Sequence, residues 1–212
     1  PEAIESVLKQ TYKPHEIIVI NDGSPDETRY VAKTYVGLKY IEITNRGLAS
    51  ARNVGIMNST GDWIYPLDSD DIMLPNCLEK VSETIEKNPD ADIIAPSFKC
   101  FGKYDSEVIL MPNPTLEDFK PVDFKTPMNR IGYFSAIKKE ALLEVGGYSP
   151  KMVWGWEDLH LWINLLSNGK KIVTINEVLV LYRTKEESMI TEANRHSSEL
   201  MSQILKDFPN LK

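Results

Sequence analysis

Hydrophobic residues in the first half of the chain follow two alternating spacings. Apolar side chains three or four positions apart predict helices, and short β-branched runs such as Ile17–Ile20 predict strands buried on both faces. The expected helices cover residues 2–11, 25–35, 48–58 and a stretch opened by Pro75 and ended by Asn88, and the expected strands cover residues 15–20, 40–43, 63–67 and 91–97. This alternation predicts an α/β fold with a largely parallel sheet, whose ligand site lies at the carboxyl ends of its strands.

The regular pattern is lost between residues 98 and 128, where prolines separate short apolar runs, and we expect a hairpin and loops there. Regular signals then return, and the expected elements are a strand over 131–138, a helix over 139–145, a helix over 157–168 and a strand over 171–182. We interpret residues 1–183 as one domain and residues 184–212 as a helical C-terminal tail.

Composition is that of an ordinary globular protein. Of the 212 residues 42% are hydrophobic and 26% are charged, and the net charge of −7 argues against a broad nucleic-acid-binding face. Cys77 and Cys100 follow no metal-ligand spacing, so we expect free thiols in a reducing compartment. The sequence contains no apolar run long enough to span a bilayer and no signal-peptide pattern. We therefore expect a cytoplasmic protein that can contact the inner face of a membrane.

Asp68-Ser69-Asp70-Asp71 closes the predicted strand 63–67 and carries the strongest chemical signal in the chain. Three carboxylates crowded at one turn repel each other unless a cation joins them. Mg²⁺ or Mn²⁺ binds such oxygens together with the phosphates of a nucleotide. The alternative is a helix start, because aspartate is favoured at helix N-caps and in first turns. These residues alone leave both interpretations open.

A second acidic turn, Asn21-Asp22-Gly23-Ser24, follows the predicted strand 15–20. Its carboxylate can accept hydrogen bonds from a base or ribose, although a plain turn favoured by glycine explains the same residues. Because both acidic turns end strands of one predicted sheet, they would face one crevice. Between them, the small residues of segment 45–55 let a helix approach a ligand, and Arg52 can reach an anion. A solvated helix face is the alternative for Arg52.

Taken in order, these motifs resemble those of glycosyltransferase family 2. The residues that carry the resemblance are Asn21–Ser24, Asn45–Gly55, Leu67–Asp71, Gly146–Tyr148 and Gly155–Asp158, and the likeness extends to about residue 183. It implies a GT-A fold, which is Rossmann-like, with a mixed and mostly parallel central sheet flanked by helices. The family normally opens with a further apolar strand, and we expect that strand to be missing upstream of Pro1.

The resemblance implies that residues 1–97 bind a nucleotide-diphosphate sugar, with a UDP-sugar favoured. On this donor side, Asp22 would contact the base and Asp68 the ribose or base, while Asn45 and Arg52 would line the same pocket. Asp70 would be the ligand of Mn²⁺ or Mg²⁺. For Asp71 two roles stay open, one in this site and one as the cap of the helix that follows.

Glu157-Asp158, at the start of the predicted helix 157–168, is the second chemical centre. A helix N-terminus stabilises carboxylates in any protein, so simple dipole complementarity is the alternative. In the family this pair lies across the cleft from the metal, in the acceptor half formed here by residues 98–183. The resemblance therefore implies that Asp158 is the general base, with Glu157 orienting it or binding the acceptor. Transfer to a sugar or lipid-linked acceptor would invert the anomeric carbon, in polysaccharide or glycolipid synthesis.

The chain departs from the family just after its last predicted strand. A histidine often stands there, whereas this sequence has Lys185 or Glu186, and we hypothesise that Lys185 supplies a charge to the diphosphate. Trp154 and Trp156 lie in the loop just before the acidic pair and either stack on a sugar or anchor the core. A haloacid-dehalogenase-like phosphatase fits less well, because Ile72 stands where that family needs Thr or Val. A catalytically impaired nucleotide-sugar-binding module is the non-enzymatic alternative.

Overall fold

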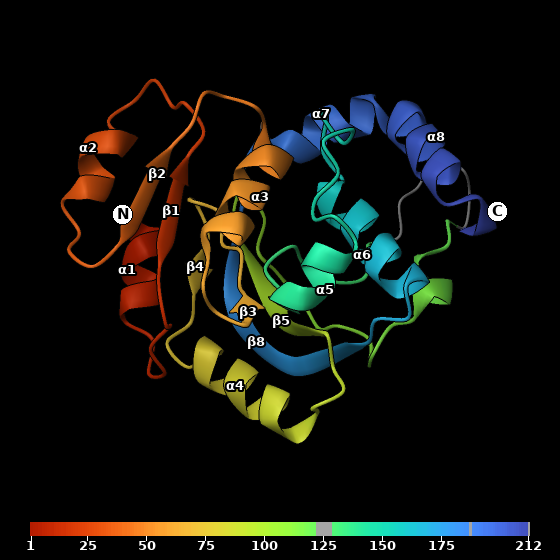
Figure 1. Ribbon diagram of the computed structural model, residues 1–212, viewed down its shortest axis with the longest axis horizontal. Coiled ribbons are helices and arrows are strands. Elements are labelled where there is room, and N and C mark those ends of the chain that lie inside the picture. The colour runs from red at the N-terminus through yellow and green to blue at the C-terminus, as the bar shows by residue number, and fades with distance from the viewer. Residues whose placement is uncertain (122–128, 187, 212) are drawn as a thin grey trace.

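A computed structural model describes residues 1–121, 129–186 and 188–211, which form a six-stranded mixed sheet, a smaller two-stranded sheet and the helices around them (Figure 1). The strands are β1 (Ile18–Asn21), β2 (Lys39–Glu42), β3 (Trp63–Ile64), β4 (Ile72–Met73), β5 (Ile93–Gly102), β6 (Ser106–Val108), β7 (Ala136–Lys138) and β8 (Ile172–Thr184). The helices are α1 (Glu2–Leu8), α2 (Thr28–Lys33), α3 (Leu48–Asn58), α4 (Cys77–Lys87), α5 (Lys139–Glu144), α6 (Glu157–Ser167), α7 (Met189–Arg195) and α8 (Ser197–Asp207), with 3₁₀ turns at Leu116–Phe119 and Pro209–Leu211. None of the helices in these ranges is long and apolar enough to cross a bilayer.

The larger sheet is built around β5 and β8, its two longest strands, which pair in parallel. The strand order is β3-β7-β5-β8-β4, and β6 pairs with β5. Alternate side chains of β5 point to opposite faces, so Ile93 and Ala95 enter one core while Ile94 enters the other. Helices α3, α5, α6 and α8 contribute to the first core, and α4 contributes to the second. The sheet is therefore covered on both faces.

The predicted α/β fold with a mixed sheet flanked by helices is confirmed, but fewer strands pair in parallel than expected. Among the described residues, β1–β2 and β5–β8 are the parallel pairs, whereas the other four pairs are antiparallel. β1 pairs with β2 in a separate sheet, and Ile18–Ile20 are half-buried rather than enclosed on both faces. A β-branched run suits a half-buried pleated surface as well as a central strand, which explains the error.

One predicted strand is shorter than expected. The stretch 131–138 forms a strand only in β7, and before it Tyr133 and Phe134 pack their rings edge to face in the second core, with centroids 4.9 Å apart. The hairpin expected between residues 98 and 128 is formed by β5 and β6. Residues 122–128 of that stretch lie outside the described residues.

The C-terminal segment, expected to be a helical tail, contains α7 and α8. Ala193, Leu200 and Ile204 are buried in the same core as α6. The spacing of Leu200 and Ile204 gives α8 an apolar stripe that faces this core. These helices are therefore packed against the rest of the chain (Figure 1).

Asn53 ties α3 to the turn that follows α5. Its Oδ1 accepts a hydrogen bond from the Tyr148 N–H, and its Nδ2 donates to the Tyr148 carbonyl oxygen, both at 2.8 Å. Gly147 has a φ of +73°, and a Cβ at this position would clash with Asn53 Oδ1. Glycine is therefore required here for both the backbone conformation and the close approach of Asn53.

Replacing Asn53 by alanine should lower the free energy of unfolding by about 2 kcal/mol, because both polar groups of the Tyr148 backbone lose their partner. Urea denaturation followed by circular dichroism measures this loss. Asn58→Ala is the matched control, since the Asn58 amide donates to Val54 of its own helix, and it should cost clearly less. Equal losses in the two variants would contradict the role given to Asn53.

Candidate active site

Arg52 on α3 lies at the centre of a buried network of charges. Its Nη1 donates to Glu157 Oε1 at 2.7 Å, and its Nη2 donates to Asp68 Oδ1 at 2.9 Å. The side chains of Arg52 and Glu157 are 8% and 7% exposed. The rings of Tyr133 and Tyr148 lie against the guanidinium, with centroids 4.6 and 5.2 Å from its central carbon. Arg52 thus joins the acidic turn after β3 to the acidic pair at the start of α6.

The acidic turn Asp68–Asp71 directs its carboxylates to different partners. Asp68 pairs with Arg52, and Asp70 Oδ2 lies 2.6 Å from Lys185 Nζ. Across the described ranges, no group of three or more His, Cys, Asp and Glu side chains is arranged to hold a metal ion. Asp68 and Asp70 nevertheless offer two carboxylates, and Mg²⁺ usually takes one or two when substrate phosphates complete its shell.

Asp71 anchors this turn inside the protein. The carboxylate is buried and accepts hydrogen bonds from the Tyr133 hydroxyl and, at 2.7 Å, from the Arg183 N–H. Burial raises the pKa of Asp71 to about 6, although both donors oppose the shift. Asp71 lies at the start of β4, and α4 begins only at Cys77, so Asp71 does not cap that helix.

A tight turn sets the position of α6. Gly155 has a φ of +126° and Trp156 a φ of +59°, and the helix begins at the next residue, Glu157. A Cβ on Gly155 would lie 3.0 Å from Ala193 Cβ on α7. Only glycine fits this position without strain, and the start of α6 therefore lies directly against α7.

This turn gives Glu157 and Asp158 different environments. Glu157 points toward Arg52, whereas Asp158 Oδ2 accepts a hydrogen bond from Asn129 Nδ2 and Asp158 Oδ1 accepts one from the Leu159 N–H, both at 2.7 Å. Burial raises the pKa of both carboxyls, and the positive charge of Arg52 opposes this shift. Within the described part of the chain, Asp158 forms no ion pair with Lys, Arg or His, whereas Glu157 is paired with Arg52.

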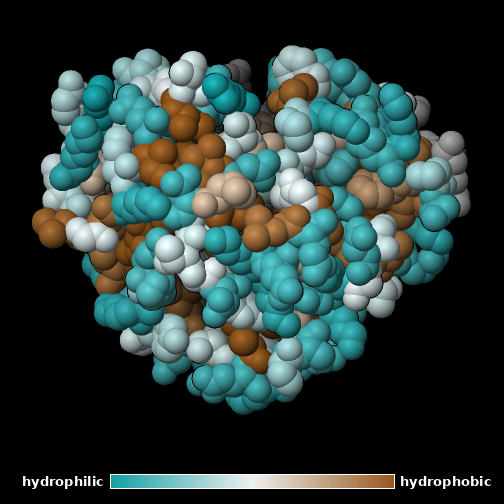
Figure 2. All heavy atoms as spheres, in the orientation of Figure 1, coloured by the Kyte–Doolittle hydropathy of each residue, from teal (hydrophilic) through white to brown (hydrophobic). Residues whose placement is uncertain are grey.

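Asp22 and Asn45 lie beside the N-terminal end of α3. Asp22 accepts hydrogen bonds from the Arg46 N–H at 2.9 Å and the Gly47 N–H at 2.8 Å. Gly23, with a φ of +74°, lets the two loops meet, since a Cβ there would lie 2.9 Å from the Asn45 backbone nitrogen. In the view of Figure 2 the upper edge of the molecule is notched between the segment leading into α3 and the start of α7.

Helix α3 therefore brings the predicted site residues together. Its start is bonded to Asp22, and one turn later it carries Arg52, which holds Asp68 and Glu157. Asp70 follows Asp68 in the acidic turn, and Asp158 follows Glu157 on α6. The residues predicted for the donor side and for catalysis are thus linked through one helix.

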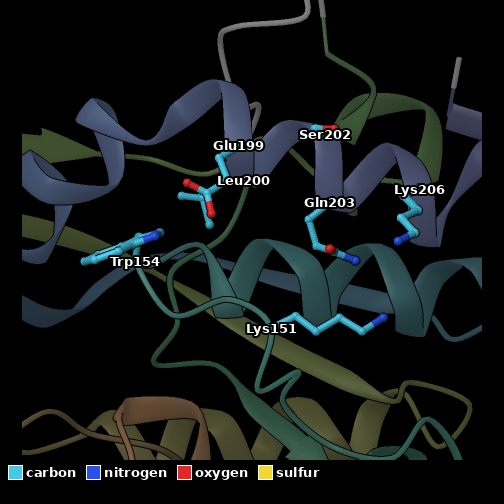
Figure 3. A pocket seen from close by; sticks show the side chains of 7 residues that line it. All are labelled: Lys151, Trp154, Glu199, Leu200, Ser202, Gln203 and Lys206. Carbon is cyan, nitrogen blue, oxygen red and sulfur yellow. The ribbon is translucent and has the colours of Figure 1, made fainter.

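A separate hollow of about 300 Å³ lies between α8 and the loop that precedes α6 (Figure 3). It is lined by Lys151, Trp154, Glu199, Leu200, Ser202, Gln203 and Lys206. The Trp154 ring stacks on the His196 ring, with centroids 4.1 Å apart. Trp156 instead packs against the first core.

Four contributors to this network were not identified as site residues from the sequence: Tyr133, Tyr148, Asn129 and Arg183. Tyr148 belongs to the Gly-Gly-Tyr motif and Arg183 directly follows the last predicted strand. The sequence therefore marked both positions but did not indicate which residues they contact. Tyr133 and Asn129 follow the poorly patterned stretch, and nothing in the sequence around them indicated a role in the site.

Comparison with known proteins identifies the family of this chain. Residues 1–146 match Glycosyl transferase family 2. The chain belongs to this family. It is 31% identical over 190 residues to an uncharacterized glycosyltransferase of Haemophilus influenzae, covering 86% of this chain and 69% of the relative. It is also 31% identical over 195 residues to an Escherichia coli protein named UDP-Gal:alpha-D-GlcNAc-diphosphoundecaprenol beta-1,3-galactosyltransferase, covering 88% and 69% of the two chains.

The fold of this family 2 chain is also found in S. aureus TarS. The structure of TarS 1–349 in complex with UDP-GlcNAc superposes with a TM-score of 0.72 at 18% identity, over 99% of this chain and 67% of that one. The complex with UDP gives a TM-score of 0.71 at 19% identity, over 99% and 66% of the two chains. The chain thus spans about two thirds of TarS 1–349 and of the two relatives, and 40% of the longer TarS chain that has also been solved.

Replacing Arg52 by methionine should destabilise the protein by about 3 kcal/mol at pH 8, because it leaves a buried Glu157 charge without its partner. The loss should be smaller by at least about 1 kcal/mol at pH 5. Burial raises the pKa of Glu157, so folding takes up a proton and stability falls as pH rises through this window. Removing the arginine, which opposes that shift, strengthens the pH dependence. Urea unfolding at the two pH values measures it.

Arg29→Met is the matched control for this prediction, because Arg29 forms an exposed ion pair with Glu42 at 3.3 Å. Exposed pairs contribute little, so this variant should stay within about 0.5 kcal/mol of the wild type at both pH values. An Arg52→Met loss that is the same at pH 5 and pH 8 would show that Glu157 is not the group left unpaired.

Proposed function

We propose that this chain is an inverting, metal-dependent hexosyltransferase that moves a sugar from a nucleotide-diphosphate donor, preferably a UDP-sugar, to an acceptor hydroxyl. The observation that carries the proposal is the double ion pair of Arg52 with Asp68 and Glu157. These ion pairs bring the acidic turn and the acidic pair into one site. A direct displacement needs such a site, because the base and the leaving group act on opposite faces of the transferred sugar.

A UDP-sugar is favoured as the donor by the names of similar proteins. The E. coli relative is named for UDP-Gal, and TarS was solved with UDP and with UDP-GlcNAc. We assign the nucleotide to Asp22, Asn45 and Asp68, whose segments meet at the start of α3. The guanidinium of Arg52 is already paired with two carboxylates. We therefore assign Arg52 the role of positioning Asp68 and Glu157, and not that of binding the diphosphate.

The family implies Mn²⁺ or Mg²⁺, and the acidic turn is chemically suited to it. Asp70 is only half-buried, and its sole ionic partner among the described residues is an exposed lysine, so its carboxylate is accessible to a cation. Asp68 supplies a second oxygen ligand close by in the turn. A divalent ion bound there would neutralise negative charge on the departing diphosphate.

Asp158 is proposed as the general base. Its carboxylate takes the proton of the acceptor hydroxyl while that oxygen bonds to the anomeric carbon and the bond from that carbon to the diphosphate oxygen breaks. A base works best when its pKa is near the working pH, and burial shifts the pKa of Asp158 upward in that direction. Glu157, bound to Arg52, then keeps α6 and Asp158 in place.

We propose that the acceptor is a sugar, free or lipid-linked, in polysaccharide or glycolipid synthesis. The name of the E. coli relative includes a diphosphoundecaprenol-linked sugar, which favours a lipid-linked acceptor. The hollow beside α8 lies next to the loop that leads to Asp158, and Trp154 offers it an aromatic wall of the kind that stacks on sugar rings (Figure 3). Acceptor binding on this side would place the chain at the cytoplasmic face of a membrane.

A panel of nucleotide sugars, incubated with and without Mn²⁺, tests the function through release of the nucleoside diphosphate. UDP-sugars should be turned over only with the metal. Binding of UDP with no transfer or hydrolysis would favour an inactive binding module instead. Release of phosphate from simple phosphomonoesters would favour a phosphatase.

Asp158→Asn should lower the rate of sugar transfer by at least about 100-fold, because the amide cannot accept the hydroxyl proton. The affinity for UDP in Mn²⁺, measured by titration calorimetry, should stay unchanged. Asp105→Asn, which alters an exposed carboxylate on the β5–β6 hairpin, should change neither quantity.

Asp70→Ala should instead abolish metal-dependent binding of UDP, because it removes the proposed metal ligand, and turnover should be lost with it. Calorimetric titration of UDP with and without Mn²⁺ measures this difference. Turnover at the wild-type rate in either variant would contradict the role assigned to that residue.

A further inference from the structure

The end of β8 holds the acidic turn through three contacts. The Arg183 N–H donates to Asp71 Oδ1 at 2.7 Å, and Arg183 Nε donates to the Asp70 carbonyl oxygen at 2.8 Å. Two residues further on, Lys185 Nζ lies 2.6 Å from Asp70 Oδ2. The backbone of the turn is thus fixed by Arg183, while the Asp70 carboxylate is neutralised by Lys185 alone among the described ion pairs.

These contacts differ in how easily they can be exchanged. Asp71 is buried with its hydrogen bonds, and Asp68 pairs with a guanidinium that is 8% exposed. The side chains of Lys185 and Asp70 are 50% and 35% exposed. Separating a buried pair leaves an unsolvated charge, whereas an exposed pair is weak and both of its members are rehydrated when they part. The ammonium of Lys185 is therefore the partner that can leave the turn most easily.

A divalent cation on Asp70 would compete directly with Lys185. The oxygen that Lys185 contacts is one of the two that Asp70 can offer to a metal, and the ammonium and the ion would repel each other at this distance. The repulsion disappears once an anion binds to the metal, because the flexible lysine stem lets the ammonium turn toward that anion. The diphosphate of the proposed donor is such an anion.

We propose that Lys185 is a movable counter-ion that neutralises Asp70 in the free protein, yields it to the divalent cation and then pairs with the diphosphate of the donor. This inference rests on the proposed function and on Asp70 as the metal ligand. It makes Lys185 oppose binding of the metal alone and favour binding of the metal together with the nucleotide. The two ligands are thereby coupled, and each strengthens the binding of the other by the same factor.

Lys185→Met tests this coupling by two titrations with opposite expected signs. Binding of Mn²⁺ alone, followed through the electron paramagnetic resonance signal of free Mn²⁺, should become about fivefold tighter, which is the factor that loss of one exposed ion pair allows. Binding of UDP in saturating Mn²⁺, followed by calorimetry, should become about fivefold weaker. Lys185→Arg should restore both affinities toward those of the wild type.

Lys103→Met is the matched control, because Lys103 pairs with Glu186 next to Lys185 and its loss changes the net charge equally. This variant should leave both affinities within about twofold of the wild type, as expected for a screened surface charge. If Lys185→Met weakens both Mn²⁺ and UDP binding, or changes neither, Lys185 is not a counter-ion that moves between them.

Asp70→Asn in the same titrations separates this failure from a failure of the proposed function. If Asp70→Asn abolishes Mn²⁺ binding while Lys185→Met matches the wild type, the metal site stands and the counter-ion is wrong. If the wild type binds neither Mn²⁺ nor UDP, or if Asp70→Asn binds both as well as the wild type, the assignment of the metal to Asp70 is wrong and the counter-ion proposal fails with it.

Discussion

The buried guanidinium of Arg52 is the constraint on which the rest of the structure depends. A charge taken out of water has to be paired, and Arg52 finds its partners 16 and 105 positions away in the sequence, in Asp68 and Glu157. Because the donors of a guanidinium lie in one plane a short distance apart, the segment after β3 and the start of α6 cannot be positioned independently. The small buried side chains of Ala49 and Ala51 let α3 lie close enough to hold both.

Around Arg52, the acidic side chains acquire different chemical characters. Asp71 is buried and accepts hydrogen bonds, Asp70 meets an exposed ammonium, and Glu157 is held by a buried arginine. Asp158, one residue beyond Glu157, meets an amide instead. The differences arise from the neighbours that the fold supplies, so an acidic motif in a sequence does not by itself show which carboxylate binds, which anchors and which accepts a proton.

The sequence predicted the helices better than the strands. Residues 48–58 form α3 as expected and α6 ends one residue early, because helical periodicity is a local property. The pairing of β1 was predicted wrongly, since apolar character shows that a strand is covered but not by which element. The motifs at Asp22, Asp68 and Glu157 were found from their order, whereas the contacts of Tyr133 and Asn129 depend on tertiary approach and have no local signature.

The contact between Gly155 and Ala193 has a consequence for how the chain can be altered. Helix α7 lies directly against the bend before the first turn of α6, so the C-terminal segment is part of the support of that turn. Exchanging this segment for that of a relative would therefore also shift the first turn of α6, which carries Asp158, the proposed general base. Under the proposed function, a change of acceptor preference made in this way would change the turnover rate as well.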